Sequence, residues 1–472
     1  MWGKVHTLTL QTTNLVQYGN DIPWSVLPKT FQDGVKISQA LGFRYVWIES
    51  LCILQDSRQD WEEAAATMAS VYQNATLVLG ASSARSDREG FLGPRHYNFI
   101  DCIRPRTRTQ AAVYVMPKIE HYDHHFADEP LATRAWTFQE RLLAQRFLSY
   151  NEKELHWECD TSWRCECGVG DYLQQGDHAY ELRRSLKDCT LLQAYDKWRF
   201  AIVKRYSGRD LTVESDKLPA LSAVAKVFEV KLGDLYLAGI WRGDLVASLC
   251  WEASMPFSHT LPSCYRAPSW SWASLNVSVT YWEDWAPTEV KIDILDAKSA
   301  PSGLNPLGEV SFGYIKVRGP LAQAWIEVDV VGPTSKKHIV LKTEDHGEFI
   351  DICEFIADNR LSNPPASTSA GILQESVTRY QPGHDGSSSN ETPSNEEGAQ
   401  PIDAKNRHIM VWCLYNAVGI PGDDPIGDSY VLVLAPSTQN PECFERIGIS
   451  ICVTEEHDHL FVNSRLETPT LV

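Results

Sequence analysis

The sequence lacks any apolar run that approaches the ~20 residues needed to cross a bilayer as a helix. Its first residues, Met1 to Lys4, show no basic stretch followed by an apolar run, so no signal peptide is expected. Basic side chains are in deficit, because 43 Lys and Arg face 61 Asp and Glu, a net charge of −18. That charge disfavours non-specific binding to nucleic acids and to anionic membranes. We therefore expect a cytoplasmic protein with no membrane span and no nucleic-acid partner.

Several catalytic signatures are also missing. The sequence contains no Gly-x-Ser-x-Gly elbow, no Walker A loop and no dinucleotide-type glycine fingerprint. The 12 cysteines are scattered, several of them inside apolar runs, which is typical of free thiols in a reducing compartment. Cys52 between Leu51 and Ile53 is expected to be buried, so a serine or cysteine hydrolase is disfavoured. No repeat of fixed period is present, which disfavours a solenoid.

The length of 472 residues exceeds what one hydrophobic core organises, so we expect two or three domains. A first domain is placed at residues 1–150 and a helical and strand-containing region at 151–361. Residues 362–405 are rich in Ser, Pro, Gly, Asn and Glu, a composition that predicts a disordered insertion. A β-rich segment, 406–472, completes the predicted organisation.

Helix and strand patterns alternate in the first domain. A helix is predicted from Leu27 to Gly42 with Thr30 as its N-cap, and a second helix begins near Asp60. Two apolar runs, 43–48 and 76–82, are aromatic or β-branched and are predicted as strands buried on both faces. This alternation predicts an α/β fold with a doubly wound, mostly parallel sheet, followed by an α+β C-terminal region.

Further elements are predicted along the rest of the chain. A third helix at 131–143 is followed by a pair of strands at 146–150 and 154–158. The His-rich stretch 121–125 is predicted to be a solvated loop. Helical patterns then cover 191–206, 216–232 and 241–251, a Trp-rich turn covers 268–274, and strand patterns cover 409–412 and 430–434.

Three segments of the first domain together resemble the heterokaryon-incompatibility (HET) domain of filamentous fungi. They match it in residue type, order and spacing, and they read LPKTFQD at 27–33, RYVWIESLCILQD at 44–56 with its continuation to Ala75, and RAWTFQERLL at 134–143. The resemblance covers about the first third of the chain. Three later segments, which carry no known activity, resemble motifs in the variable tails behind such domains and lie at 216–221, 236–241 and 267–274.

Two features depart from the family pattern. The family opens with a strand that ends in Ser-Tyr-x-Trp-Gly, of which only Met1-Trp2-Gly3 is present, so the first HET strand is expected to be missing. A central strand is costly to lose, because its neighbours lose ladder hydrogen bonds in a buried place. The family also usually carries Asp at the position of Glu49, so the acid is kept here with a longer side chain.

The resemblance implies a chemistry, because the HET domain is thought to be a distant relative of TIR domains, some of which cleave NAD. Those TIR domains hold a catalytic Glu four residues after a Trp, which carries over to Glu140 and Trp136. An i, i+4 pair shares one helical face, so the indole would flank the carboxylate. Departure of nicotinamide leaves an oxocarbenium-like ribose, which a nearby carboxylate stabilises. NAD is thus a candidate substrate, and no bound cofactor is expected.

Each candidate residue also has a purely structural interpretation. Glu140 can pair with Arg134, Arg141 or another surface cation and do nothing else. Glu49 and Asp56 follow a predicted buried strand at the end where open α/β sheets bind ligands, so they are the next candidates for substrate binding. For both of them the alternative is polar capping of a loop.

His156, Cys159, Cys165 and Cys167 are four potential metal ligands that lie close together in the sequence. Their spacing is not a regular zinc pattern, because the two closing thiols are only two residues apart. We therefore expect no metal.

Two functions follow from the resemblance. The first is a signalling module of fungal non-self recognition, which the C-terminal region holds silent until release allows self-association and programmed cell death. Its partner would be a second copy of the chain or an incompatibility partner protein. The second is a TIR-like NAD glycohydrolase that kills by depleting NAD. The two overlap, since self-association can assemble an active site.

Overall fold

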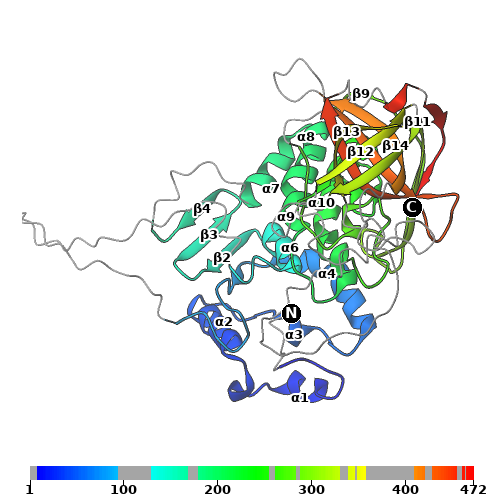
Figure 1. Cartoon of the computed structure of the whole chain (residues 1–472). Coiled ribbons are helices and arrows are strands. Elements are labelled where there is room, and N and C mark those ends of the chain that lie inside the picture. The colour runs from blue at the N-terminus through cyan, green and yellow to red at the C-terminus, as the bar shows by residue number, and fades with distance from the viewer. Residues whose placement is uncertain are drawn as a thin grey trace, which may run out of the picture. The chain divides into compact units, whose positions relative to one another are not determined.

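The computed structural model describes eleven stretches of the chain, namely residues 8–93, 129–167, 179–254, 261–282, 287–329, 338–345, 348–357, 409–419, 428–453, 460–462 and 464–472. Contacts divide the chain into two compact units, labelled by element in Figure 1. Unit one comprises Met1–Ala238 with Pro301–Ser311, and unit two comprises Gly239–Ala300 with Phe312–Val472. The domain boundaries predicted from the sequence stay predictions. Among the described helices, none combines the length and the apolar character that crossing a membrane requires.

Three expectations concern residues outside the described ranges. They are the missing first HET strand at residues 1–3, the solvated loop at 121–125 and the disordered insertion at 362–405.

Helices dominate the beginning of unit one, and their bounds are α1 (Leu15–Asn20), η1 (Trp24–Val26), α2 (Lys29–Ala40), α3 (Glu49–Cys52) and α4 (Arg58–Asn74). The helices predicted near residues 27 and 60 are thus confirmed. Gly42 follows α2 with a φ of +78°, a left-handed conformation that favours glycine and ends the helix as predicted. The Ser57 hydroxyl accepts a hydrogen bond from the Asp60 N–H and caps the start of α4.

The first turn of α2 does more than begin a helix. Thr30 is not the N-cap of α2. Pro28 occupies that position, and the helix starts at Lys29. The Thr30 hydroxyl instead accepts a hydrogen bond from the Gly90 N–H at 3.1 Å. The fully buried Asp33 carboxylate accepts from the N–H groups of residues 91–92 at 3.1 and 3.3 Å. This turn therefore fixes the loop that follows the first strand.

The strand predicted at 43–48 is wrong for the described structure. These residues are irregular, and no described strand pairs with them. Tyr45 is 82% exposed, which is the opposite of the burial expected. Aromatic and β-branched residues favour a strand only where a neighbouring strand supplies the ladder and the packing. Trp47 lies instead edge-on to Tyr72 of α4, with ring centroids 5.8 Å apart.

The sheet of unit one has the strand order β1-β2-β3-β4, with bounds Val78–Gly80, Arg146–Tyr150, Leu155–Cys159 and Ser162–Cys165. Strands β1 and β2 are parallel, whereas β2–β3 and β3–β4 are antiparallel. The strands predicted at 76–82, 146–150 and 154–158 are therefore confirmed. A mostly parallel, doubly wound sheet is not found among the described residues, because the segment 43–48 does not join it. The class is confirmed as mixed helix and strand.

The later helices of unit one are α6 (Ala135–Leu143), α7 (Ala179–Asp188), α8 (Leu191–Asp196), the π-helical η3 (Lys197–Val203), α9 (Lys204–Tyr206), the 3-10 turns η4 (Glu214–Lys217) and η5 (Pro219–Leu221), and α10 (Ser222–Leu232). They confirm the helices predicted at 131–143, 191–206 and 216–232, although each begins later or is divided. Helix α10 packs against α4, α6 and α8. Residues beyond the predicted first domain thus share a core with its helices.

Unit two begins with a core of buried tryptophans. Trp251, Trp270 and Trp272 are each 0% exposed. The Trp272 Nε1 donates to the Gly239 carbonyl at 2.9 Å, and a Cβ on Gly239 would lie 2.9 Å from that nitrogen. The predicted helix 241–251 is only two short pieces, η6 (Arg242–Asp244) and α11 (Leu245–Ser248). The other short elements of this part of unit two are β6 (Ile240–Trp241), β7 (Glu252–Ala253), η7 (Trp272–Ser274) and β8 (Val279–Thr280), whereas β5 (Tyr236–Leu237) belongs to unit one.

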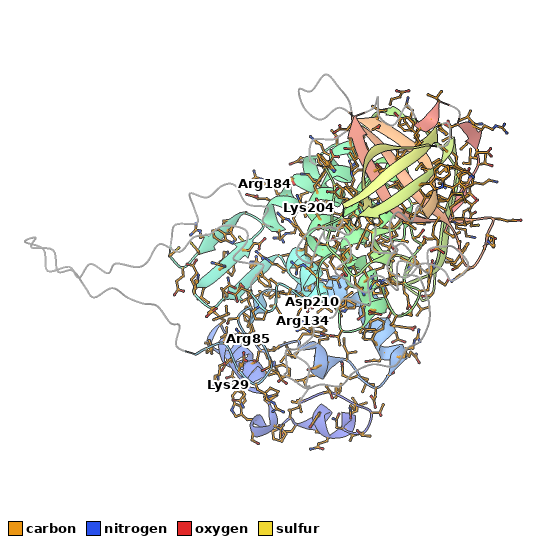
Figure 2. The ribbon with its side chains drawn as sticks, in the orientation of Figure 1. Lys29, Arg85, Arg134, Arg184, Lys204 and Asp210 are labelled. Carbon is orange, nitrogen blue, oxygen red and sulfur yellow. The ribbon has the colours of Figure 1, made fainter. Side chains whose placement is uncertain are left out.

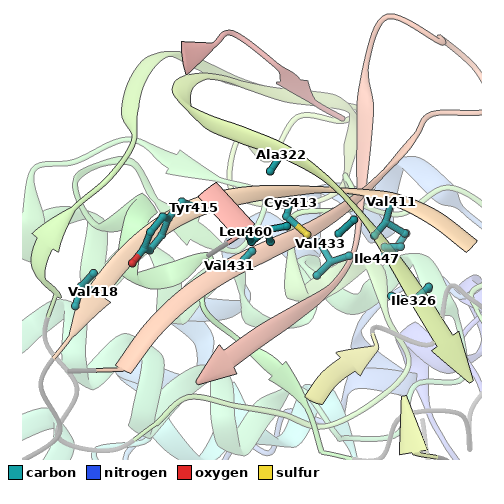
Figure 3. Packing of buried hydrophobic residues seen from close by; sticks show 11 residues of the cluster. Ala322, Ile326, Val411, Cys413, Tyr415, Val418, Val431, Val433, Ile447 and Leu460 are labelled. Atoms are coloured by element: carbon teal, nitrogen blue, oxygen red, sulfur yellow. The ribbon is translucent and has the colours of Figure 1, made fainter. Parts of the chain in front are cut away.

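The remainder of unit two is a large sheet that is antiparallel except for the parallel pair β16–β18. Its strands are β9 (Pro287–Val290), β10 (Asp293–Pro301), β11 (Val310–Asp329), β12 (His338–Asp345), β13 (Glu348–Ala357), β14 (Ile409–Gly419), β15 (Asp428–Pro436), β16 (Phe444–Val453), β17 (Arg465–Glu467) and β18 (Thr470–Leu471). Strand β11 pairs with both β12 and β14, so the sheet closes on itself. Figure 3 shows the apolar cluster inside it, which includes Val411, Cys413, Val431, Val433 and Ile447. The strands predicted at 409–412 and 430–434 are confirmed in β14 and β15.

Candidate functional site

A group of ionisable side chains gathers where α3, α4 and α6 meet in unit one. Tyr72 lies in the last turn of α4, Glu140 lies in α6, Glu49 begins α3, and Arg134 immediately precedes α6. Glu140 interacts electrostatically with Glu49 and Arg134 and with the Tyr72 hydroxyl. We call Glu49, Tyr72, Arg134 and Glu140 the acidic cluster.

The packing of α6 explains why Glu140 is held there. The buried face of α6 consists of Ala135, Gln139, Leu142 and Leu143. Helix α6 packs on α4 through this face, and the Gln139 amide lies 3.8 Å from the sulfur of the buried Met68. Glu140 follows Gln139 and sits at the edge of the face, so its side chain is only partly exposed. A carboxylate in that position loses hydration and responds strongly to neighbouring charge.

Burial and like charge together shift the titration of the acidic cluster. The pKa of Glu140 is raised to about 7, first by burial and then by the nearby Glu49 carboxylate, while Arg134 and the hydrogen bond with Tyr72 oppose the rise. Burial likewise raises the pKa of Tyr72 well above its usual value, and the charges of Glu140 and Glu49 add to that effect. The pKa of the Arg134 guanidinium is lowered by burial, against the attraction of the two carboxylates. Glu140 is therefore a carboxyl group that exchanges its proton near neutral pH.

Trp136 points its indole N–H at a different carboxylate. Its Nε1 donates to Asp216 at 3.0 Å, and its ring lies edge-on to Trp61 at 6.3 Å between centroids. The pKa of Asp216 is raised to about 6, because burial and the charges of Glu309 and Glu49 outweigh the hydrogen bond from Trp136, which lowers it. Trp136 therefore donates its indole hydrogen bond to a residue outside the three matched segments.

Residues 210–232, which we call the covering segment, lie against the helices that hold the acidic cluster. The backbones of Arg134 and Asp210, both labelled in Figure 2, form an isolated parallel β-bridge. In it the Ala135 N–H donates to the Asp210 backbone carbonyl at 3.0 Å. Within this segment, η5 packs on α6, and α10 packs on both α4 and α6. The Ala223 N–H donates to the buried Gln139 amide oxygen at 3.3 Å. The covering segment therefore joins α6 through its backbone and its side chains.

The structure brings only some of the predicted site residues together. Glu140 and Glu49 meet in the acidic cluster. Asp56 lies apart from it on the surface, where its carboxylate accepts from the Thr12 N–H at 3.0 Å and the Thr12 hydroxyl at 2.6 Å. Those hydrogen bonds from Thr12 lower the pKa of Asp56. Its geometry is that of the loop-capping alternative.

The ion-pair alternative for Glu140 is met in part. Arg141 pairs with Glu158 at 3.0 Å, whereas Arg134 does interact with Glu140. The structural and the chemical interpretations of Glu140 thus share the same contact with Arg134. The catalytic role of Glu140 stays a prediction. The binding roles of Trp136, Glu49 and Asp56 also stay predictions.

Sequence reasoning assigned no site role to Tyr72, Arg134 or Asp216. Each had a detectable signal, because Tyr72 and Arg134 lie in the second and third matched segments and Asp216 begins the tail motif at 216–221. The sequence did not indicate the contact between Asp216 and Trp136, which lie 80 residues apart. Cys52, expected to be buried, is exposed in α3.

The acidic cluster is separate from the surface depression found in unit one. A shallow depression of about 390 Å³ in unit one lies elsewhere, between α7 and α8, and is lined by Ser185, Asp188, Cys189, Gln193, Asp196 and Lys197. The acidic cluster offers two carboxylates, a phenol and a guanidinium, which together suit proton transfer and the binding of hydroxyl groups.

Comparisons with known proteins bear on the same part of the chain. No curated protein matches the chain, and no solved structure matches it. Residues 1–140 match the family model described as Heterokaryon incompatibility protein (HET). All four residues of the acidic cluster lie within that match, whereas the covering segment lies outside it. The first 140 residues of this chain therefore match the HET domain family.

Proposed function

We propose that this chain acts in fungal non-self recognition, as a signalling module whose cell-death output is restrained by the region that follows its HET domain. One observation carries the proposal: the covering segment, outside the HET match, packs on α4 and α6, which hold the acidic cluster. Restraint of this kind acts on populations, because the packed state competes with a minor open state. A signal that favours the open state releases the domain to self-associate.

The contact between Trp136 and Asp216 is the best place to weaken that restraint. Trp136→Phe removes the indole N–H but keeps an aromatic ring beside Trp61, so the core of unit one is largely preserved. Asp216 then keeps its raised pKa and loses the donor that opposed it. Loss of such a bond to a partly buried carboxylate costs about 1–3 kcal/mol. A change of that size shifts a closed–open equilibrium by roughly 5- to 150-fold.

The test is expression of the full chain and of Trp136→Phe in a filamentous fungus, with dead hyphal compartments counted at matched protein levels. We expect more death with Trp136→Phe than with the wild type. Trp282→Phe is the matched control, because its exposed indole also donates to a carboxylate, that of Glu252 at 3.4 Å. It should behave like the wild type. Equal death with Trp136→Phe and with the control would refute the restraint.

A second candidate function is cleavage of NAD at the nicotinamide–ribose bond, and the titration of Glu140 favours it. A carboxyl group with a pKa of about 7 beside Glu49 can take or give a proton near neutral pH. In its charged form it can stabilise a developing oxocarbenium ion, and the Tyr72 hydroxyl beside it is a donor for a ribose oxygen. The substrate would be NAD itself, with no bound cofactor.

NAD content separates the two candidates. It would be measured in the same cells expressing Trp136→Phe, with Glu140 either intact or changed to Gln. If NAD falls only where Glu140 is intact, the enzymatic candidate is supported. Death with undiminished NAD would reject the enzyme and leave the signalling module in place.

A further inference from the structure

The end of the β3–β4 hairpin collects three potential metal ligands. Glu154 immediately precedes β3, Cys165 ends β4, and Cys167 follows in the next turn. The carboxylate oxygen and the two sulfurs all lie within 4.8 Å of one another, and the two sulfurs are 2.9 Å apart. Glu154 is 1% exposed and Cys165 is 9% exposed, so two of the three ligands are buried, whereas Cys167 is half-buried.

The surroundings hold the carboxylate in position. One Glu154 oxygen lies 3.0 Å from His156 Nε2, and the other accepts from the Cys167 N–H at 3.1 Å. The opposite nitrogen of the ring, His156 Nδ1, contacts the Asn151 amide. Carboxylates that bind metals in proteins are themselves held by hydrogen bonds from groups around the site, as Glu154 is here.

The hairpin register also explains the short spacing of the two thiols. His156 and Cys165 are direct cross-strand partners, so their side chains lie on the same face of the sheet. Cys159 occupies the alternate face of β3 and contacts Thr161 and Ser162 instead. Because the chain turns directly after Cys165, a thiol only two residues later returns to the same place.

We propose that Glu154, Cys165 and Cys167 bind a zinc ion, with a water molecule as its fourth ligand and His156 orienting the carboxylate. Thiolates favour Zn²⁺ among the available divalent ions. A tetrahedral ion with Zn–S bonds of ~2.3 Å needs sulfurs about 3.8 Å apart. The sulfurs must therefore separate by about 1 Å, and the half-buried turn that carries Cys167 can supply that movement. Binding releases the two thiol protons to solvent.

Metal content tests the site directly. The full chain would be purified from a reducing cytosol without chelators, and its zinc measured per chain by mass spectrometry. We expect one zinc in the wild type and in the control Cys159→Ser, and at least tenfold less in the double variant Cys165→Ser, Cys167→Ser. Zinc at the wild-type level in the double variant would overturn the site. So would a Cys165–Cys167 disulfide in the freshly purified wild type.

Wild-type protein alone supplies a second readout, which is needed if the double variant does not fold. Cobalt added to the metal-free chain should give the intense thiolate-to-cobalt charge-transfer absorption, and zinc should then abolish it by displacement. Titration with zinc in weak buffer should release two protons per ion bound. A wild type that binds neither ion, with both thiols free to react, would contradict the proposal.

Discussion

The indole nitrogen of Trp136 lies 3.0 Å from a carboxylate oxygen of Asp216, 80 residues further along the chain. Trp136 lies in α6 within the HET match, whereas Asp216 belongs to the covering segment outside that match. Glu49 raises the pKa of both Asp216 and Glu140. The contact therefore joins the covering segment to the helix that carries Glu140.

Stability should depend on pH through Glu140. Its pKa is about 7 in the folded chain, against an ordinary value of about 4.3 when unfolded. The folded state therefore holds this proton more tightly, so the contribution to stability is full below about pH 4 and is lost as the pH rises through 7. We predict that Glu140→Gln is about 3–4 kcal/mol more stable than the wild type at pH 8 and equal to it near pH 4.

Urea unfolding of both proteins at several pH values measures that difference. Comparing the two proteins cancels the titration of all other groups, including Asp33. Burial raises the pKa of Asp33, but Lys29 and two backbone N–H groups lower it by more, so its pKa is lowered overall. A difference that stays constant between pH 4 and pH 8 would show that the pKa of Glu140 is not raised.

Arg134 should be the cation that keeps the acidic cluster folded. Arg134→Met keeps the length of the side chain but leaves Glu49 and Glu140 without its charge. We predict a loss of about 2–3 kcal/mol in the free energy of unfolding, because partly buried carboxylates then face each other uncompensated. Arg58→Met is the control, since Arg58 pairs with Glu62 on the surface and should cost about 0.5 kcal/mol or less.

A double-mutant cycle makes the same prediction sharper. If Arg134 acts on Glu140, the loss caused by Arg134→Met should shrink by more than half in the Glu140→Gln background. Unfolding in urea at pH 8 provides all four free energies. Additive effects of the two substitutions would mean that Arg134 supports the fold by other contacts.

The local parts of the fold were predictable from the sequence. Helices α2 and α4 have apolar residues at helical spacing, with Gly42 and Ser57 at their ends, and the β2–β3 pair is a short hairpin. Such elements are determined by contacts between near neighbours in the chain. The segment 43–48 has an equally clear strand composition and still forms no strand, because a strand requires a partner, and sequence composition does not reveal which partner is present.

The candidate site was predictable only where its residues lie in matched segments of the sequence. Glu140 and Glu49 stand in matched segments, so the resemblance indicated both. The pairing of Trp136 with Asp216 depends on how residues far apart in the chain fold together, and the i, i+4 spacing suggested Glu140 as the neighbour of the indole instead. The short spacing of Cys165 and Cys167 argued against a metal until the hairpin register placed them with Glu154.

Unit two should depend on one buried guanidinium. Arg446 is 0% exposed, lies 3.5 Å from the centroid of the Trp251 ring, and donates to the carbonyls of Leu249 and Trp251. Arg446→Met keeps much of the volume but leaves both carbonyl acceptors buried without these donors. We predict a loss of about 3 kcal/mol in the free energy of unfolding.

Arg318→Met is the matched control in the same unit, because its pair with Asp293 is exposed on both sides and should contribute less than about 1 kcal/mol. Tryptophan fluorescence during unfolding follows both variants. Equal stability of the two variants would mean that the stacked guanidinium adds nothing beyond its apolar stem.

The central claim is that the covering segment restrains an output that depends on Glu140. The most direct measurement is hyphal death in a strain that expresses the double variant Trp136→Phe, Glu140→Gln, compared at equal protein level with Trp136→Phe alone. We predict that the single variant kills and that the double variant does not, because the released domain then lacks its titrating carboxyl. Equal killing by both variants would contradict the claim that the acidic cluster is the functional centre of this HET domain.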